Sequence, residues 1–392
     1  MLTCEPVVVR TNSLQCNCGS HWLILKGILH ICTRKHKEFW KRYVPLRPEK
    51  KQCMKRIAIV LLALIGTCVG LQAQKQRGDS ISLRPSFGVD LTSEVHTDFR
   101  EGRLANLLQL YADIPITRKL LLEVHSISTL SSDELPLCID VQGYSNINTY
   151  GVNIPFALSV AGLTWQINER HSVFAGIRRT DEDYFCSDGL ALFTNSSCGI
   201  FPTLSWNAYI ATYPEADVGI HYKFDNEKLC LQASLYNGEG NHAFTGRYNV
   251  FRFCPNSDGL LALAQAEYRH RGSHYFLGAN IHTQPEITSS VWAYAEQALS
   301  PRLTLLAAYS HAFGSTTVCK DFCGLGAKYA FKRAELGVFT DYVRILGFNE
   351  WATELICSLP LTDFLTVKPV LHVITSNGET ACIGMLRMDI SF

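Results

Sequence analysis

Apolar and polar side chains alternate along most of the chain after residue 73. Between positions 216 and 224 every second side chain is apolar, and polar or small residues lie between them. A turn at 225–228 follows, and residues 229–236 repeat the alternation. Successive side chains of a β-strand point to opposite faces, so this pattern predicts a hairpin with one apolar and one polar face.

The same alternation recurs in sixteen segments. They are centred near residues 86, 109, 124, 160, 176, 220, 232, 264, 279, 294, 307, 327, 338, 356, 369 and 387. Short connections, such as those at 168–171 and 300–302, take turns with longer ones. Short turns at one end, longer loops at the other and an even strand number are typical of outer-membrane barrels. The sequence therefore predicts an all-β fold, a transmembrane antiparallel up-and-down β-barrel of 16 strands, with its apolar face toward lipid and its polar face toward water.

A soluble β-sandwich is the main structural alternative, because it also alternates. The segments here run to ~10 residues rather than the usual 5–6. Aromatic residues also lie at predicted strand ends, where membrane girdles form. They are Tyr111, Trp165, Tyr222, Phe224 and Phe331. Phe392 ends the last alternating strand and resembles the signal that the outer-membrane assembly machinery recognises. We therefore expect this machinery, outer-membrane lipids and lipopolysaccharide as partners.

Residues 54–73 have the order of a secretory signal peptide. Two cations after Met54 precede an apolar run at 57–65, and small residues then lead to Ala73. The apolar run is shorter than the ~20 residues that a membrane-spanning helix needs. We expect cleavage after Ala73, which leaves 74–392 as a barrel in the bacterial outer membrane.

Residues 1–53 precede this signal peptide. If they belonged to it, its positively charged N-terminal region would be extraordinarily long. We expect translation to begin at Met54 and 1–53 to be an upstream leader outside the mature protein. The alternative is a small metal-binding domain, whose ligands would be Cys4, Cys16, Cys18, His21, His30 and Cys32. The spacing of these residues matches no common zinc site.

Charge and cysteine content exclude several functions for the part of the chain after residue 73. That part holds 24 basic and 32 acidic residues, because much of the positive charge lies in 1–53. An acidic surface of this kind lacks the clustered cations that bind the phosphates of nucleic acid. Nine of the fifteen cysteines lie there without zinc-site spacing, so we expect no metal or cofactor. Most act as small apolar side chains, and a disulfide between Cys186 and Cys198 stays open.

The longest connection, at about 179–214, lies between the fifth and sixth predicted strands. It is the third outer loop, and sixteen-stranded porins resemble one another in folding this loop into the lumen. Residues 178–184 begin it with charges of both signs. Mixed charges at a constriction orient water and polar solutes. We expect the loop to constrict a channel, and a solvated surface loop is the alternative.

Residues from about 140 to 245 resemble the carbohydrate-selective porin family (OprB-type). Six stretches carry the resemblance: Val141–Ile147, Val173–Arg178, Asp183–Phe185, Leu192–Gly199, Tyr213–Gly219 and Leu235–Asn241. The resemblance implies a porin for passive diffusion of glucose and other small saccharides. The family's Asp-Phe element is Asp183-Tyr184-Phe185 here, a departure that concerns sugar specificity more than fold.

Ten residues are candidates for lining the pore or contacting a sugar, through carboxylates, guanidinium groups or aromatic faces. They are Arg178, Arg179, Asp181, Asp183, Tyr184, Trp206, Glu215, Asp217, Glu239 and Arg247. Trp206 is equally compatible with an aromatic girdle. Many porins trimerise, and the sequence leaves a homotrimer open, together with the ion preference.

Two other function classes are alternatives to a porin. An outer-membrane hydrolase needs a nucleophile and a base brought together, and the chain has no GxSxG element. Its histidines on the polar strand faces suit a lumen hydrogen-bond network, so we expect no enzyme. A structural or adhesin barrel with a plugged lumen remains the alternative.

Overall fold

The computed structural model describes residues 83–132, 137–138, 140–208, 210–242, 249–284, 286–345 and 347–392. All of these belong to one unit of the chain, Gly70–Phe392. The predicted leader at 1–53 and the predicted signal peptide at 54–73 lie outside the described residues. Among the described residues, no helix is both long and apolar enough to cross a membrane.

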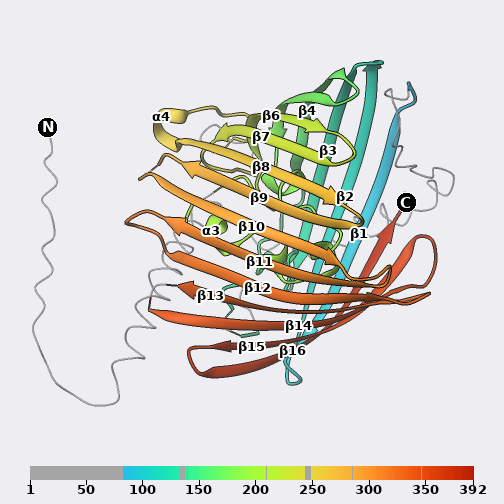
Figure 1. The fold of residues 1–392 in the computed structure, drawn as a ribbon, viewed down its shortest axis with the longest axis vertical. Helices are drawn as coiled ribbons and strands as arrows, with labels where there is room; N and C mark the ends of the chain where they lie inside the picture. Colours follow the sequence, from blue (N-terminus) through green and yellow to red (C-terminus); the bar gives the residue numbers. More distant parts are fainter. Residues whose placement is uncertain are drawn as a thin grey trace, which may run out of the picture. The chain divides into compact units, whose positions relative to one another are not determined.

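Sixteen antiparallel strands close into a barrel, as Figure 1 shows. They are β1 (Ser86–Thr97), β2 (Gly102–Thr117), β3 (Leu120–Ser131), β4 (Ala157–Asn168), β5 (His171–Arg178), β6 (Asp217–Asp225), β7 (Leu229–Asn237), β8 (Leu260–His270), β9 (Ser273–His282), β10 (Thr288–Ala298), β11 (Leu303–Phe313), β12 (Cys319–Ala330), β13 (Glu335–Ile345), β14 (Phe348–Pro360), β15 (Leu365–Ser376) and β16 (Glu379–Ser391). Each pairs with its neighbours in sequence, and β1 also pairs with β16. The predicted sixteen-stranded up-and-down barrel is confirmed.

The outer face of the barrel is apolar along every part of its circumference. On β9, for example, Tyr275, Leu277 and Ile281 are exposed, whereas Phe276 between them is buried. Leu325 on β12 is 70 % exposed, which in water would leave a large apolar surface uncovered. A hydrocarbon surrounding removes that cost, so this face fits the predicted contact with lipid.

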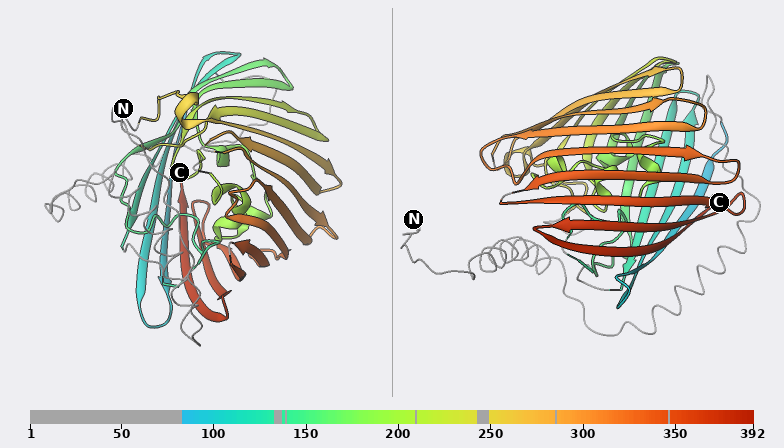
Figure 2. Two further views of the ribbon diagram at one scale, coloured as in Figure 1. Left: turned by 90° about the vertical axis from the view of Figure 1, so that its left-hand side faces the viewer. Right: turned by 60° about the horizontal axis from the view of Figure 1, so that its bottom comes forward.

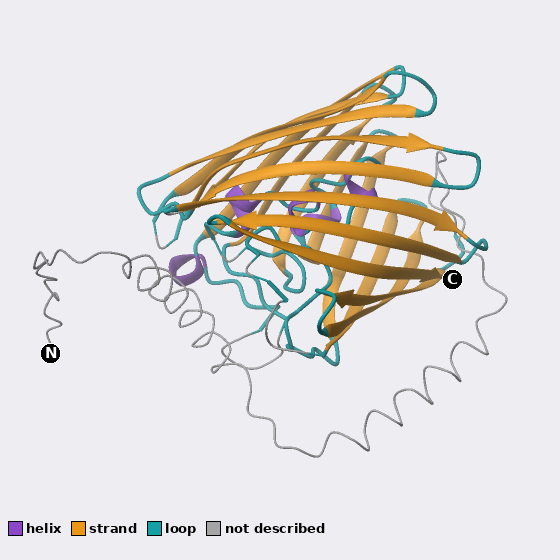
Figure 3. Ribbon diagram, turned by 90° about the horizontal axis from the view of Figure 1, so that it is seen from below, coloured by secondary structure: helices purple, strands orange, loops and turns teal. Residues whose placement is uncertain are grey.

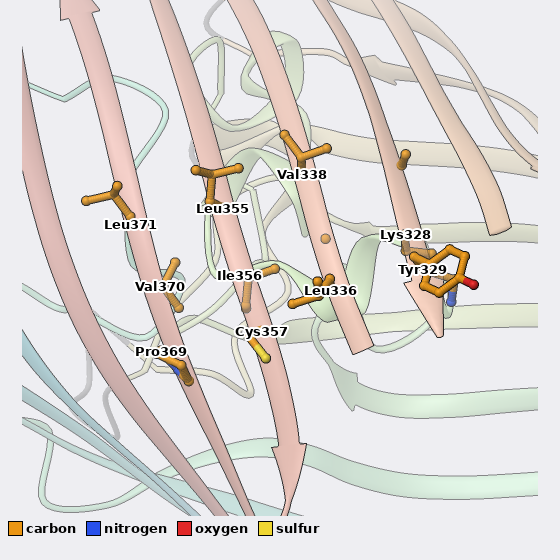
Figure 4. Close-up of a pocket in the computed structure, with 12 residues that line it drawn as sticks. Lys328, Tyr329, Leu336, Val338, Leu355, Ile356, Cys357, Pro369, Val370 and Leu371 are labelled. Carbon is orange, nitrogen blue, oxygen red and sulfur yellow. The ribbon is translucent and has the colours of Figure 1, made fainter. Parts of the chain in front are cut away.

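A shallow pocket on β12–β15 belongs to the same apolar face. Figure 4 shows the side chains that line it. Tyr329, Leu336, Val338 and Leu355 border it and are all exposed. Its apolar lining makes it a further part of the surface that would contact acyl chains.

The connections at the two ends of the barrel differ less than the sequence predicted. One end carries only short turns, at 118–119, 169–170, 226–228, 271–272, 299–302, 331–334 and 361–364. The opposite end carries three long loops, which we name the second loop (132–156), the third loop (179–216) and the fourth loop (238–259). The other connections at that end are short, at 98–101, 283–287, 314–318, 346–347 and 377–378. Long outer loops are therefore confined to the half of the barrel formed by β3–β8.

The third loop runs through the interior of the barrel. Its helical segments are η1 (Thr180–Glu182), η2 (Leu190–Leu192), η3 (Ser196–Cys198) and α3 (Pro202–Ser205). Figures 2 and 3 show them enclosed by the strands. The remaining helix, α4 (Pro255–Asp258), lies in the fourth loop.

Part of the inner wall is aromatic, which corrects the prediction that polar side chains line it throughout. The inward-facing aromatic rings on β9–β13 include Phe276, Trp292, Tyr294, Phe322 and Phe339, and all five are buried. Rings of the third loop pack against them. The ring centroids are 4.9 Å apart for Phe185 and Trp292, 4.8 Å for Phe201 and Phe322, and 5.4 Å for Phe193 and Phe339. Alternation separates two faces of a strand, but it does not show that a loop covers the inner one.

Glycine makes room for the largest of these rings. A Cβ at Gly278 of β9 would lie 2.2 Å from ring atoms of Trp292, its partner on β10. The indole therefore lies flat across the neighbouring strand, and its N–H donates to Gln265 at 3.1 Å. This arrangement gives the third loop a smooth apolar surface to pack on.

We expect a charge on the outer face to destabilise the barrel far more than one on the inner face. Leu277→Arg, in the middle of β9, should lower the free energy of unfolding in lipid vesicles by about 2–4 kcal/mol, because the guanidinium would enter hydrocarbon. Gln166→Arg, on the inner face of β4, is the matched control and should change it by less than about 1 kcal/mol. Denaturant titration of the two variants measures the difference, and equal effects would contradict the assignment of the faces.

Candidate functional site

The third loop begins and ends at neighbouring positions of the barrel wall. Arg178 ends β5 and pairs in register with Asp217, the first residue of β6. Within the loop, the N–H and the hydroxyl of Thr180 both donate to the carbonyl of Ala211, at 2.7 Å each. These bonds close the base of the loop, so the segment between them projects inward as one unit.

An arginine network stands at this base. The Arg178 guanidinium binds both carboxylate oxygens of Asp183, at 2.6 and 2.8 Å, and Glu123 of β3 at 3.1 Å. The Phe174 ring lies 4.8 Å from the guanidinium carbon. The Arg178 side chain keeps 15 % of its surface exposed. Two carboxylates therefore hold one cation at the inner wall, in the bidentate geometry that fixes arginine most firmly.

A second ion pair lies within the loop. Arg179 pairs with Glu182 and lies 3.7 Å from Asp181. Asp181 in turn accepts the N–H of Tyr213 at 3.1 Å, and the Tyr213 ring lies beneath the Arg179 guanidinium. Burial raises the pKa of Asp181, and the charge of Arg179 opposes that rise. These contacts join the two ends of the loop.

Tyr184 and Asp217 are fully buried. The Tyr184 hydroxyl lies 2.8 Å from the hydroxyl of Ser234 on β7 and donates to the carbonyl of Leu263 on β8 at 3.3 Å. Asp217 accepts hydrogen bonds from the N–H of Val218 and the side chain of Asn237. Both candidates thus lie away from solvent: Tyr184 joins the third loop to β7 and β8, and Asp217 joins the ends of β6 and β7.

The other candidates lie farther from the arginine network. The Trp206 indole donates to the carbonyl of Val141 at 2.8 Å, so it links the third loop to the second and is no part of an aromatic girdle. Glu215 lies 3.5 Å from His242. The carbonyl of Glu239 accepts bonds from Asn237 and Asn241 in the fourth loop. Arg247 lies outside the described residues.

Inner-wall carboxylates on the opposite strands hold the third loop. Glu354 of β14 accepts the N–H groups of Thr194 and Asn195, at 2.8 and 3.0 Å. Glu296 of β10 accepts the N–H of Gly189 at 2.8 Å, and Asp341 of β13 accepts the hydroxyl of Ser197. Sequence reasoning missed these three residues. Their only signal was an acidic side chain on the polar face of an alternating strand.

The second loop also enters the barrel, which sequence reasoning did not foresee. Glu350 of β14 accepts the N–H groups of Val141 and Gln142, and Arg387 of β16 donates to Asn146 at 2.9 Å. The two loops contact each other as well, because the N–H of Asn146 donates to the carbonyl of Thr194. Together they form a packed insert that contacts the wall on many sides.

Another part of the inner wall stays polar and reaches solvent. Asp113 of β2 and Lys223 of β6 are 37 % and 39 % exposed. On β16, Arg387 and Asp389 form an ion pair at 3.1 Å, and Asp389 also binds Lys368 of β15. Cations and anions are therefore interspersed along the wall on β1–β6 and β15–β16, across from the aromatic half.

The described cysteines are all free, including Cys186 and Cys198. Cys198 is buried in the third loop, whereas Cys186 is exposed. A disulfide therefore makes no contribution to holding the loop, and its position depends on packing and hydrogen bonds.

Comparison with known proteins places the fold among the outer-membrane porins. No family model matches the chain, and no curated protein matches its sequence. Solved structures do match: OprB of Pseudomonas putida is 16 % identical, with a TM-score of 0.67 over 79 % of this chain and 94 % of that one. A loop-deletion variant of OmpT from Vibrio cholerae is 12 % identical, with a TM-score of 0.54 over 79 % of this chain and 99 % of that one.

An anion-selective porin from Comamonas acidovorans is 12 % identical, with a TM-score of 0.53 over 79 % of this chain and all of the other. The chain thus has the sixteen-stranded porin fold. At these identities the likeness concerns the fold, and at that level the resemblance to OprB-type porins is confirmed.

We expect Glu354 to hold the middle of the third loop in place. Glu354→Ala leaves two N–H groups without their acceptor, at a cost of about 1–3 kcal/mol each. Hydrogen exchange of residues 190–198 should then rise at least about tenfold, while exchange in the strands stays unchanged. Glu227→Ala removes an exposed acid from the turn between β6 and β7, and it should leave the loop protected. Equal exchange in both variants would contradict this role.

Docking of the second loop should weaken as the pH rises. Burial raises the pKa of Asp140 from 3.8 to about 6, although the N–H groups of Tyr144 and Gly143 lower it. Because the folded state holds this proton more tightly, the docked loop is favoured most below about pH 4 and loses that advantage as the pH rises through about 6. Protection of residues 141–146 from hydrogen exchange, corrected for intrinsic rates, should therefore fall between pH 4.5 and 7.5. Asp140→Asn should reduce the change, and protection that grows with pH would refute it.

Proposed function

We propose that the protein is a porin of the bacterial outer membrane, forming a water-filled channel for passive diffusion of small polar solutes. The observation that carries the proposal is the third loop, which enters the barrel and packs against one side of its wall, so that a polar wall with charges of both signs remains on the other side. Charges of both signs keep water and polar solutes oriented without strongly retaining one ion. The porin fold supports the same function and favours a channel over an enzyme.

We further propose that sugars are the preferred solutes. The resemblance in residues 140–245 supports this, and one of the similar structures is OprB. Arg178 and Asp183 are the best placed of the ten candidates to contact a sugar, because Arg178 ends β5 on the inner wall and Asp183 binds it at the base of the loop. Tyr184 would act indirectly, by holding the loop, and Asp217 by joining the ends of β6 and β7. The remaining candidates, including Arg247, are proposed as secondary contacts.

The proposal extends to the maturation of the protein, its membrane partners and its oligomeric state. The mature protein would begin at residue 74 after cleavage of the signal at 54–73, and the Phe392 strand would be presented to the assembly machinery. Lipids and lipopolysaccharide would contact the apolar outer face. A homotrimer is in keeping with the trimer form recorded for OmpT of Vibrio cholerae, one of the similar structures.

A plugged structural or adhesin barrel is the second candidate, and one observation favours it. The rings of the third loop and of β9–β13 form a continuous buried core inside the barrel. If the insert also closes the polar side, solutes cannot pass, and the outer loops would carry the function.

Single-channel conductance in planar bilayers, with glucose and maltooligosaccharides added, tests the proposal. We expect open channels whose current sugars reduce. Arg178→Gln breaks the ion pairs with Asp183 and Glu123, so the sugar concentration for half-block should rise about tenfold, which corresponds to about 1.4 kcal/mol.

Lys228→Gln is the matched control, because it removes a cation from an exposed turn between β6 and β7. It should leave sugar block unchanged. A folded, heat-modifiable barrel without conductance would refute the channel and favour the plugged barrel. Channels that sugars do not affect would refute the sugar preference alone.

A further inference from the structure

Three potential metal ligands meet on the polar inner wall of β2 and β3. They are Asp113, Glu123 and His125, and one ligand atom from each lies within 4.8 Å of the other two. None was among the candidates predicted from the sequence. No other group of three or more such side chains comes this close within the part of the chain that the structure describes.

The strand pairing fixes this arrangement. Asp113 pairs directly with Glu123, and His125 pairs with Tyr111 on the adjacent inward-facing position. The His125 Nε2 atom lies 2.9 Å from Oδ1 of Asp113. The Tyr111 ring stands edge-on to the imidazole, 5.0 Å away. Two rungs of one ladder therefore hold all three donors on the same face, which is the rigid support that a metal site needs.

The charge balance at this point favours the binding of a cation. Arg178 is shared between Glu123 and Asp183, so one guanidinium serves two carboxylates. Asp113 has no Lys or Arg within ion-pair distance among the described residues, and its one such partner is His125. Among the described residues, Arg178 is therefore the one Lys or Arg that pairs with any of the three carboxylates Asp113, Glu123 and Asp183.

In two other His–carboxylate pairs of the barrel, an arginine also binds the carboxylate. His274 lies 2.7 Å from Glu267, but Arg269 also binds that carboxylate. His311 lies 2.7 Å from Asp321, which Arg344 neutralises. In each of these pairs an arginine binds the carboxylate that the histidine contacts. In the β2–β3 group, Asp113 is the carboxylate that His125 contacts, and no arginine binds it among the described residues.

The donor set selects the class of ion. One imidazole and two carboxylates suit a first-row divalent transition metal such as Zn²⁺, which takes four ligands at about 2.0–2.2 Å. Asp113 reaches solvent, so an ion can enter from the lumen and water can fill the fourth position. Mg²⁺ and Ca²⁺ require six or more oxygen ligands and are poorly served here.

We propose that Asp113, Glu123 and His125 form a lumen-facing binding site for a divalent transition-metal ion of the Zn²⁺ type. The ion would compete with Arg178 for Glu123, because the same carboxylate serves both. Occupancy would therefore alter the arginine network at the base of the third loop. The binding site itself does not depend on the proposed channel, whereas an effect on current does.

Isothermal titration of the tag-free, full-length protein in detergent with ZnCl₂ tests the site. The thiols are first blocked with N-ethylmaleimide, because exposed cysteines also bind Zn²⁺. We expect one site that His125→Asn weakens at least about tenfold, that Asp113→Asn also weakens, and that MgCl₂ does not fill. His311→Asn is the matched control, since it removes the imidazole of a His–Asp pair without a second carboxylate, and it should bind Zn²⁺ as the parent does.

Heat-modifiable mobility shows that each variant is folded. Equal Zn²⁺ binding by the parent protein and by folded His125→Asn would overturn the proposal, and so would equal losses in His125→Asn and His311→Asn. Conductance recorded with and without Zn²⁺ separates the two proposals. Zn²⁺ binding to a barrel that never conducts would support the site and refute the channel.

Discussion

Every backbone N–H and C=O group inside a membrane needs a partner within the protein, and the closure of β1 onto β16 meets that requirement. Their register runs from Asp90 with Ser391 to Thr97 with Gly384, so neither terminal strand offers a free edge to hydrocarbon. Closure also separates an interior from the lipid, so the side chains and loops inside the barrel can differ in chemistry from its outer face. The aromatic wall, the carboxylates and the inserted loops all depend on that separation of two environments.

The interior is organised by chemistry that differs from one side to the other. On β9–β13 the third loop buries its rings against the wall, and backbone N–H groups of both inserted loops find acceptors on acidic side chains of β10 and β14. On β1–β6 the wall keeps solvated charges of both signs. A carboxylate that accepts backbone N–H groups suits this role, because it can satisfy several donors of an irregular segment that has no ladder partner.

The strands and their two faces could be predicted from the sequence because the signal is local. On β9, residues 273–282 alternate so regularly that Leu277 and Phe276 fall on opposite faces without further information. The cover over Phe276 could not be predicted, since it comes from residues of the third loop. Glu354 is separated from its partner Thr194 by 160 positions, so no local pattern identifies it as an acceptor. Arg178 and Asp183, in contrast, lie close in sequence. The charges of both signs at 178–184 therefore sufficed to predict that they belong to the same cluster.

The contacts of the inserted loops have a consequence for the order of folding. Val141 and its acceptor Glu350 are separated by 209 positions, and Asn146 and Arg387 by 241. Neither loop can dock until strands from the last quarter of the chain are in place. Such long-range contacts close large loops of chain and form slowly. The rings of the third loop therefore find their wall contacts only once β9–β13 are in place, which makes docking a late step of barrel assembly.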